Sequence, residues 1–129
     1  MTPKPIFLSL MLCSIFVIGF VSMSITDTGP MHSKYPFRPL TMEELARFHG
    51  HLGPFIVLGA RMGEHSVTAH HFPRHFGVTV KVECPDQPPQ SCLIDGLQLS
   101  TGATLGKRNI SHGVADEIRV TLQENDSGH

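Results

Sequence analysis

Cysteine is scarce in this sequence, and neither sign of charge is in excess. Only three cysteines are present, and Cys13 lies inside an apolar N-terminal run. The other two thiols are too few for a four-cysteine iron–sulfur cluster within one domain. Ten lysines and arginines nearly balance eleven aspartates and glutamates, so no basic stripe is available for a phosphate backbone. These shortages argue against iron–sulfur chemistry and against nucleic-acid binding.

Several familiar motifs are also missing. No HExxH zinc motif occurs. The glycine-rich stretch from Gly102 to Lys107 is not a phosphate-binding P-loop, because only three residues separate its glycines and Arg108 stands where Ser or Thr is required. No internal repeat is visible. The chemistry must therefore be sought in less regular groups of residues.

The first 25 residues stand apart from the rest of the chain. Residues 6–25 carry no charge, and an uncharged helix of that length can span a bilayer core of about 30 Å. They are interpreted as a transmembrane anchor or an exported signal segment, leaving the side of the membrane open. Residues 26–39 are rich in proline and form a predicted linker. Residues 40–129 remain for one domain, near the lower size limit for stability alone.

Sequence patterns in this domain predict an α+β fold. Thr41 and Glu44 fit a capping box, which predicts a helix over 42–49 that ends at Gly50. Pro54 is suited to the first position of a long helix reaching about His71. Further elements are predicted as a strand over 78–83, a helix over 92–99 and a strand over 117–123. We expect a small mixed or antiparallel sheet packed against one long helix, behind an N-terminal transmembrane or signal helix.

Histidine is the compositional outlier. The chain has nine histidines, and His49 and His51 flank a glycine in the run FHGHLGP. The glycine frees the backbone, so both imidazoles can turn toward one point. Neutral imidazoles bind zinc, nickel, iron or copper, but two histidines supply only part of a zinc site. A capping role for one histidine and simple exposure of the other is the alternative.

Cys92 is the natural third ligand, and Asp95 follows it by three residues. If this segment is helical, thiol and carboxylate share one face. Asp95 can bind a metal, orient an imidazole or transfer a proton, or it can be an ordinary surface residue. Cys84 offers a rival account, because a Cys84–Cys92 disulfide in an oxidising compartment would remove the thiolate from a metal.

Lys107 and a second histidine group complete the candidate residues. Lys107 lies on the glycine-rich turn, where its ammonium can meet a small anionic ligand. The second group comprises His65, His70, His71 and His75. Its spacing is irregular, so a polar helix face and turn is favoured over a second metal site.

The runs FHGHLGP and CLIDGLQLSTGATLGKRNI together resemble the two signatures of the FmdE family, which is named after a component of formylmethanofuran dehydrogenase. The resemblance covers most of the domain and implies an α+β homodimer that binds a metal in a cleft. It nominates His49, His51 and Cys92 as ligands of a divalent transition metal, zinc first, with nickel or iron as alternatives. It further implies that the cleft is lined by Asp95, Gln98, Thr101 and Lys107. Many relatives have cysteine in place of Gly53 and Ala103, so a sulfur-rich site is not expected in this chain.

Three functional hypotheses follow. The first is a membrane-tethered metal-binding accessory protein; the family name comes from an association with one-carbon metabolism and does not imply oxidation of formylmethanofuran. The second is a metal-assisted hydrolase or redox enzyme with Asp95 as acid or base and Lys107 holding an anionic group. The third is a tethered interaction module without metal, in which Cys84 and Cys92 form a disulfide.

Overall fold

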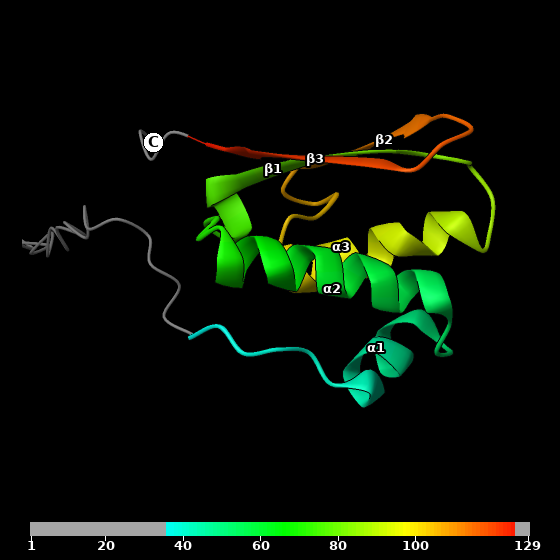
Figure 1. The fold of residues 1–129 in the computed structure, drawn as a ribbon, viewed down its shortest axis with the longest axis horizontal. Coiled ribbons are helices and arrows are strands. Elements are labelled where there is room, and N and C mark those ends of the chain that lie inside the picture. Colours follow the sequence, from blue (N-terminus) through cyan, green and yellow to red (C-terminus); the bar gives the residue numbers. More distant parts are fainter. Residues whose placement is uncertain (1–35, 126–129) are drawn as a thin grey trace, which may run out of the picture.

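The computed structural model describes residues 36–125, in which helices cover one face of a small sheet. Figure 1 shows the sheet as one layer, helices α2 and α3 side by side as the next, and α1 beyond them. The helices are α1 (Met42–His49), α2 (Pro54–Ala69) and α3 (Leu93–Thr101). The strands are β1 (Val78–Cys84), β2 (Ile110–Val114) and β3 (Arg119–Glu124), and short 3₁₀ turns occupy His75–Gly77 and Gln90–Cys92. The predicted α+β class is confirmed.

The predicted N-terminal helix over residues 6–25 lies outside the described residues, as does most of the predicted linker. Among residues 36–125, no helix has the length and apolarity needed to cross a bilayer.

The sheet is mixed, with strand order β2-β1-β3. β1 pairs with β2 in parallel and with β3 antiparallel, so Val80 has Ile110 on one side and Leu122 on the other. Alternate residues of β1, from Val78 to Cys84, are buried, because successive side chains of a strand point to opposite faces. The prediction of a strand with one buried face is confirmed, and β2 was missed.

Two helices, rather than the single long helix that we expected, pack on the sheet. Leu93 and Leu97 of α3 are fully buried with Val80 and Val82 of β1. Phe55 and Met62 of α2 pack against the same cluster. A second, smaller cluster of Leu45, Ile56 and Ala60 joins α1 to α2. The α2–α3 pair is therefore the central layer. The C-terminal end of α1 and the N-terminal end of α3 lie on the same side of the domain.

Glycines allow this close packing. A Cβ at Gly59 would collide with the Leu93 carbonyl, and one at Gly96 would collide with the Ile56 carbonyl. Only residues without a side chain fit where two helix backbones approach this closely. Gly59 of α2 and Gly96 of α3 therefore serve the packing of the two helices.

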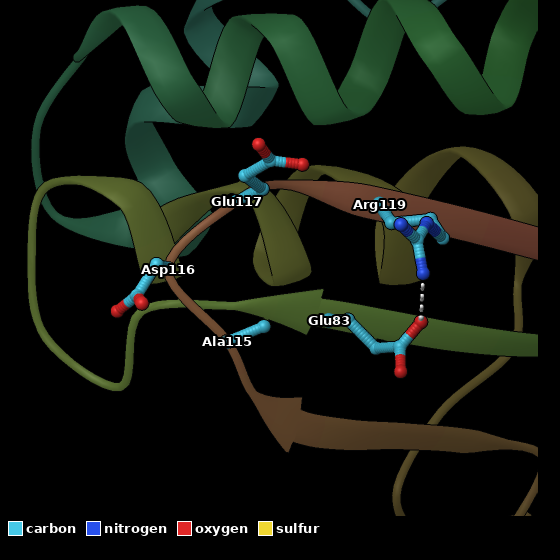
Figure 2. A pocket seen from close by; sticks show the side chains of 5 residues that line it. All are labelled: Glu83, Ala115, Asp116, Glu117 and Arg119. Carbon is cyan, nitrogen blue, oxygen red and sulfur yellow. Dashed lines mark ion pairs between the residues drawn. The ribbon is translucent and has the colours of Figure 1, made fainter.

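The outer face of the sheet is polar and carries an ion-pair network near the end of β1. Glu83 accepts a hydrogen bond from Lys81 at 3.0 Å. The Glu83 carboxylate also lies 3.8 Å from the Arg119 guanidinium (Figure 2). A hollow of about 330 Å³ is lined there by Glu83, Arg119 and the 115–117 turn.

Candidate metal site

His49 is placed at the site by a well-defined helix end. The predicted capping box is present at the start of α1: the Thr41 hydroxyl accepts the Glu44 N–H at 3.2 Å, and Glu44 accepts the Thr41 N–H at 2.9 Å. At the other end Gly50 has φ of 90° and donates to the Ala46 carbonyl at 2.8 Å. This left-handed conformation suits glycine, and it turns the chain directly after His49.

The imidazole of His49 is held by Asp95. Nδ1 of His49 lies 2.7 Å from Oδ2 of Asp95, although 46 residues separate them. The His49 side chain is 12% exposed and that of Asp95 is 35% exposed. An ionised carboxylate only accepts hydrogen bonds, so a neutral imidazole paired with it carries its proton on Nδ1 and its lone pair on Nε2. Asp95 thereby fixes both the tautomer and the orientation of the ring.

The second nitrogen of His49 has no partner. Among the described residues, Nε2 of His49 is the one buried side-chain nitrogen or oxygen without a hydrogen bond. Leaving such a group unpaired costs about 1–3 kcal/mol. A histidine that donates one N–H to a carboxylate while its other nitrogen is free has the arrangement found in metal-ligating histidines.

His51 lies beside the ring of His49. The ring centroids of His49 and His51 are 4.7 Å apart, with the rings tilted by 39°. A Cβ placed on Gly53 would lie 3.3 Å from Nε2 of His51, so a side chain at position 53 would reach this nitrogen. The structure therefore places the His49 ring in contact with Asp95 and beside His51, and it places Gly53 next to the His51 ring.

Cys92 lies one helical turn before Asp95. Its backbone is helical, with φ of −60° and ψ of −18°, and the side chain is half-buried. Residues three apart on a helix share a face, with Cβ atoms about 5–6 Å apart. Cys84 and Cys92 are both free thiols, and Cys84 is buried. Burial raises the pKa of the Cys84 thiol, and its sulfur lies 3.4 Å from Nε2 of His112.

The candidate ligands are not gathered into a finished metal centre. Within residues 36–125, no three histidine, cysteine, aspartate or glutamate side chains stand close enough to hold a metal ion as they lie. The donor chemistry of His49 fits a metal, but ligation through His49, His51 and Cys92 together requires side-chain rearrangement.

The remaining predicted site residues lie elsewhere on α3 and the loop after it. The Thr101 hydroxyl donates to the Leu97 carbonyl at 2.6 Å and accepts the Ala103 N–H at 3.1 Å, and the residue is buried. Gln98 Oε1 accepts the Leu105 N–H at 3.3 Å. Both side chains therefore stabilise the end of α3 and the following loop, a structural role that the motif alone did not reveal.

Lys107 belongs to a different neighbourhood from Asp95. Its Nζ lies 5.7 Å from the Phe76 ring centroid and 3.3 Å from the Thr104 hydroxyl. Asp95 is in the first turn of α3, whereas Lys107 follows the last turn. The two side chains suggested for catalysis therefore flank opposite ends of a nine-residue helix, about 13 Å long at 1.5 Å per residue.

Two hollows of the described surface lie apart from these residues. One is the acidic hollow at the end of β1. The other, of about 310 Å³, is lined by Met62, His65, Ser66, His70, Phe72 and Leu122. His65 and His70 meet edge to face there, with ring centroids 5.1 Å apart. Neither hollow is lined by His49, His51, Cys92, Asp95 or Lys107.

Comparison with known proteins identifies the family. A sequence model of FmdE, described as molybdenum formylmethanofuran dehydrogenase operon, matches residues 48–129. The chain belongs to the FmdE family. The match begins at Phe48, the first residue of the FHGHLGP run, and includes every residue of the candidate site. The family resemblance inferred from the two motifs is therefore confirmed.

A much longer protein is also similar to part of this chain. A probable S-adenosyl-L-methionine-binding protein of Archaeoglobus fulgidus is 35% identical over 69 residues. The aligned part is 49% of this chain and 18% of that relative, so the chain spans less than a fifth of the relative's length.

Proposed function

We propose that this FmdE-family chain is a metal-binding accessory protein that holds a divalent transition metal through His49, His51 and Cys92. Zinc is the first choice, with nickel or iron as alternatives, because imidazole and thiolate together suit these ions. The observation that carries the proposal is the buried, unpaired Nε2 of His49. A metal bound there would satisfy the nitrogen.

Local geometry supports the inclusion of Cys92. The thiol precedes Asp95 by one helical turn, and Asp95 contacts His49 directly. Rotation of the His51 and Cys92 side chains, without movement of α1 or α3, is the rearrangement that we propose on metal binding. A reduced Cys92 is required, because a disulfide would remove the thiolate donor.

The position of Asp95 favours an accessory role over an acid–base enzyme. Its carboxylate is engaged with Nδ1 of His49 at 2.7 Å, and Lys107 lies beyond the other end of α3. In the proposed site Asp95 positions a ligand instead of transferring a proton.

We further propose that the domain works as a homodimer tethered to a membrane through residues 6–25. Large apolar side chains are exposed on both sides of the histidine pair: Phe48 is 53% exposed and Leu52 is 49% exposed. Exposed apolar groups beside a site are suited to burial against a partner. In a dimer they would shield the metal from water.

Metal content and oligomeric state can be measured in one experiment. The full chain, without a histidine tag, would be purified under reducing conditions in a nonionic detergent and analysed by native and elemental mass spectrometry. We expect one metal per chain and a mass of two chains. His49→Ala, His51→Ala and Cys92→Ala should each lose most of the metal.

The matched control is His65→Ala, which removes an exposed histidine of α2 and should keep the metal. A wild-type chain that takes up no zinc, nickel or iron would refute the metal site. A single-chain mass with full metal content would refute the dimer alone.

A further inference from the structure

Three basic side chains of the described residues have no carboxylate partner, and they lie close together in the fold. Arg38, Arg47, Arg61, Lys81 and Arg119 each pair with a glutamate. Within residues 36–125, Arg74, Lys107 and Arg108 form no such pair. Arg74 directly precedes the η1 turn (His75–Gly77), and the other two lie on the loop after α3. Uncompensated positive charge is therefore concentrated beyond the C-terminal end of α3.

His75 connects these two segments. Its ring lies against Gly102, where an added Cβ would collide with the imidazole. Its carbonyl accepts a hydrogen bond from Asn109 Nδ2 at 2.5 Å, and the same amide nitrogen donates to the Val78 carbonyl at 2.7 Å. The Asn109 side-chain oxygen accepts the Thr104 N–H at 3.0 Å. Asn109 thus fixes the loop that carries Lys107 to the turn that carries His75.

The side chains of Arg74 and Lys107 are each held in place by contacts with neighbouring residues. Arg74 Nε donates to the Ser100 carbonyl at 3.0 Å, and its guanidinium lies 5.2 Å from the Phe37 ring centroid. Lys107 lies over the Phe76 ring and beside the Thr104 hydroxyl. Within the described residues the terminal nitrogens of Arg74 donate to no protein oxygen, so they are free for a ligand.

The pKa of His75 is affected by the positive charges around it. Burial, followed by the charges of Arg74 and Lys107, holds the pKa of His75 below its ordinary value. An anion bound between the cations would offset both charges and favour the protonated imidazole.

The backbone is strained at one residue of each segment, at His75 in the η1 turn and at Arg108 in the loop after α3. His75 has φ of 60° and Arg108 has φ of 58°, and they are two of the three described non-glycine residues with positive φ. Side chains other than glycine pay a steric cost in this region, and such residues gather at functional sites.

We propose that Arg74, His75 and Lys107 form a binding site for a phosphate group, either free or carried by an organic ester. Arg supplies planar, paired donors and Lys a compact charge, which together suit phosphate oxygens. Phe76, which is 58% exposed, offers an apolar surface for the organic part of an ester. The site lies at the opposite end of α3 from His49 and does not depend on metal binding.

The test is a titration of the full chain with inorganic phosphate and with phenyl phosphate, followed by NMR of the His75 imidazole in a nonionic detergent. We expect a saturable change and a rise in the pKa of His75, with no such change in sodium chloride of equal ionic strength. Tighter binding of phenyl phosphate would identify an ester as the preferred form, and equal binding would identify the free anion.

Variants test the assignment. Lys107→Met should weaken phosphate binding by about tenfold or more, since a charge-assisted hydrogen bond is lost, and Lys107→Arg should restore much of it. Lys81→Met, which removes a paired lysine of the sheet, should bind as the wild type does. A linear response, an equal response to chloride or wild-type binding by Lys107→Met would overturn the proposal.

Discussion

At the scale of single residues, the contact between His49 and Asp95 gives the candidate site its order. The resemblance to the FmdE family placed both residues in one site, whereas the CxxD spacing alone left Asp95 open to being an ordinary surface residue. The sequence left the role of Asp95 open among ligand, orienting group and proton donor. Only the packing of α1 beside α3 could decide, since it brings together residues 46 positions apart.

Replacement of Asp95 by asparagine tests this orienting role. The amide would keep the shape of the side chain but lose the charge that holds the Nδ1 proton. We expect Asp95→Asn to bind metal about 10–100-fold more weakly, as is typical for loss of such a partner, with the fold retained. Competition with a chromophoric chelator measures the affinity, and circular dichroism checks the fold.

Asp86→Asn serves as the control, because Asp86 is exposed on the loop before η2 (Gln90–Cys92). An Asp95→Asn variant whose metal affinity equals that of this control would show that the carboxylate does not orient a ligand.

At the scale of elements, the predictions succeeded where the local signal was strong. The capping box of α1 and the proline at the start of α2 gave the correct helix starts. Strand β2, Ile110–Val114, was missed because it is short and contains Gly113, and glycine is unfavourable in strands. Its place beside β1 depends on a parallel pairing between distant segments, which no local pattern reveals.

The contact between α2 and α3 makes a prediction about stability. Gly59→Ala would place a methyl group into the Leu93 carbonyl. We expect a loss of about 1–3 kcal/mol in the free energy of unfolding, the usual cost of overpacking. Urea denaturation of the full chain, followed by circular dichroism, measures it.

Gly106→Ala is the matched control in the loop after α3. The nearest atom to its Cβ would be the Thr104 hydroxyl oxygen at 4.0 Å, so alanine fits there. We expect this variant to be as stable as the wild type or slightly more stable, because alanine restricts the unfolded chain. Equal stability of the two alanine variants would show that the helices have room to separate at Gly59.

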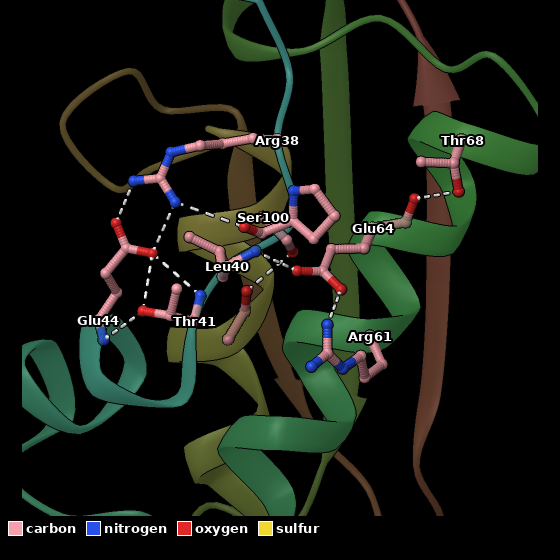
Figure 3. A network of polar contacts seen from close by, with 10 residues as sticks. Arg38, Leu40, Thr41, Glu44, Arg61, Glu64, Thr68 and Ser100 are labelled. Carbon is pink, nitrogen blue, oxygen red and sulfur yellow. Dashed lines mark hydrogen bonds and ion pairs between the residues drawn. The ribbon is translucent and has the colours of Figure 1, made fainter.

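At the scale of the whole molecule, residues 36–41 tie the N-terminal end of the described chain to two helices (Figure 3). Glu64 of α2 is only 7% exposed; it accepts the Leu40 N–H at 2.6 Å and pairs with Arg61. Arg38 pairs with Glu44 in the first turn of α1. The sequence predicted the cap on α1 but not these links, because they join the residues before α1 to side chains that come close only in the folded chain. They hold α1, and with it His49, in place.

The Arg38–Glu44 pair predicts how this attachment responds to acid. The hydrogen bond from Arg38, with that from the Thr41 backbone, lowers the pKa of Glu44 from 4.5 to about 2. A carboxyl group whose pKa is lower in the folded state than in the unfolded chain stabilises the fold at every pH above the unfolded-chain pKa. That contribution is lost as the pH falls from about 4.5 toward about 2, because the unfolded chain takes up the proton first. The link between Arg38 and α1 should therefore weaken within this acidic window and stay intact near neutral pH.

An NMR titration of the Glu44 side-chain carboxyl in the full chain checks this prediction. We expect a midpoint near 2 in the wild type and a clearly higher midpoint in Arg38→Gln, which keeps a polar side chain but removes the charge. Arg47→Gln is the control, because Arg47 pairs with Glu43 on the exposed side of the same helix. It should leave the Glu44 midpoint unchanged. A wild-type midpoint near 4.5 would mean that Arg38 does not hold Glu44 in solution. The position of α1 would then depend on Glu64 and on the apolar contact of Leu45 with Ile56 and Ala60.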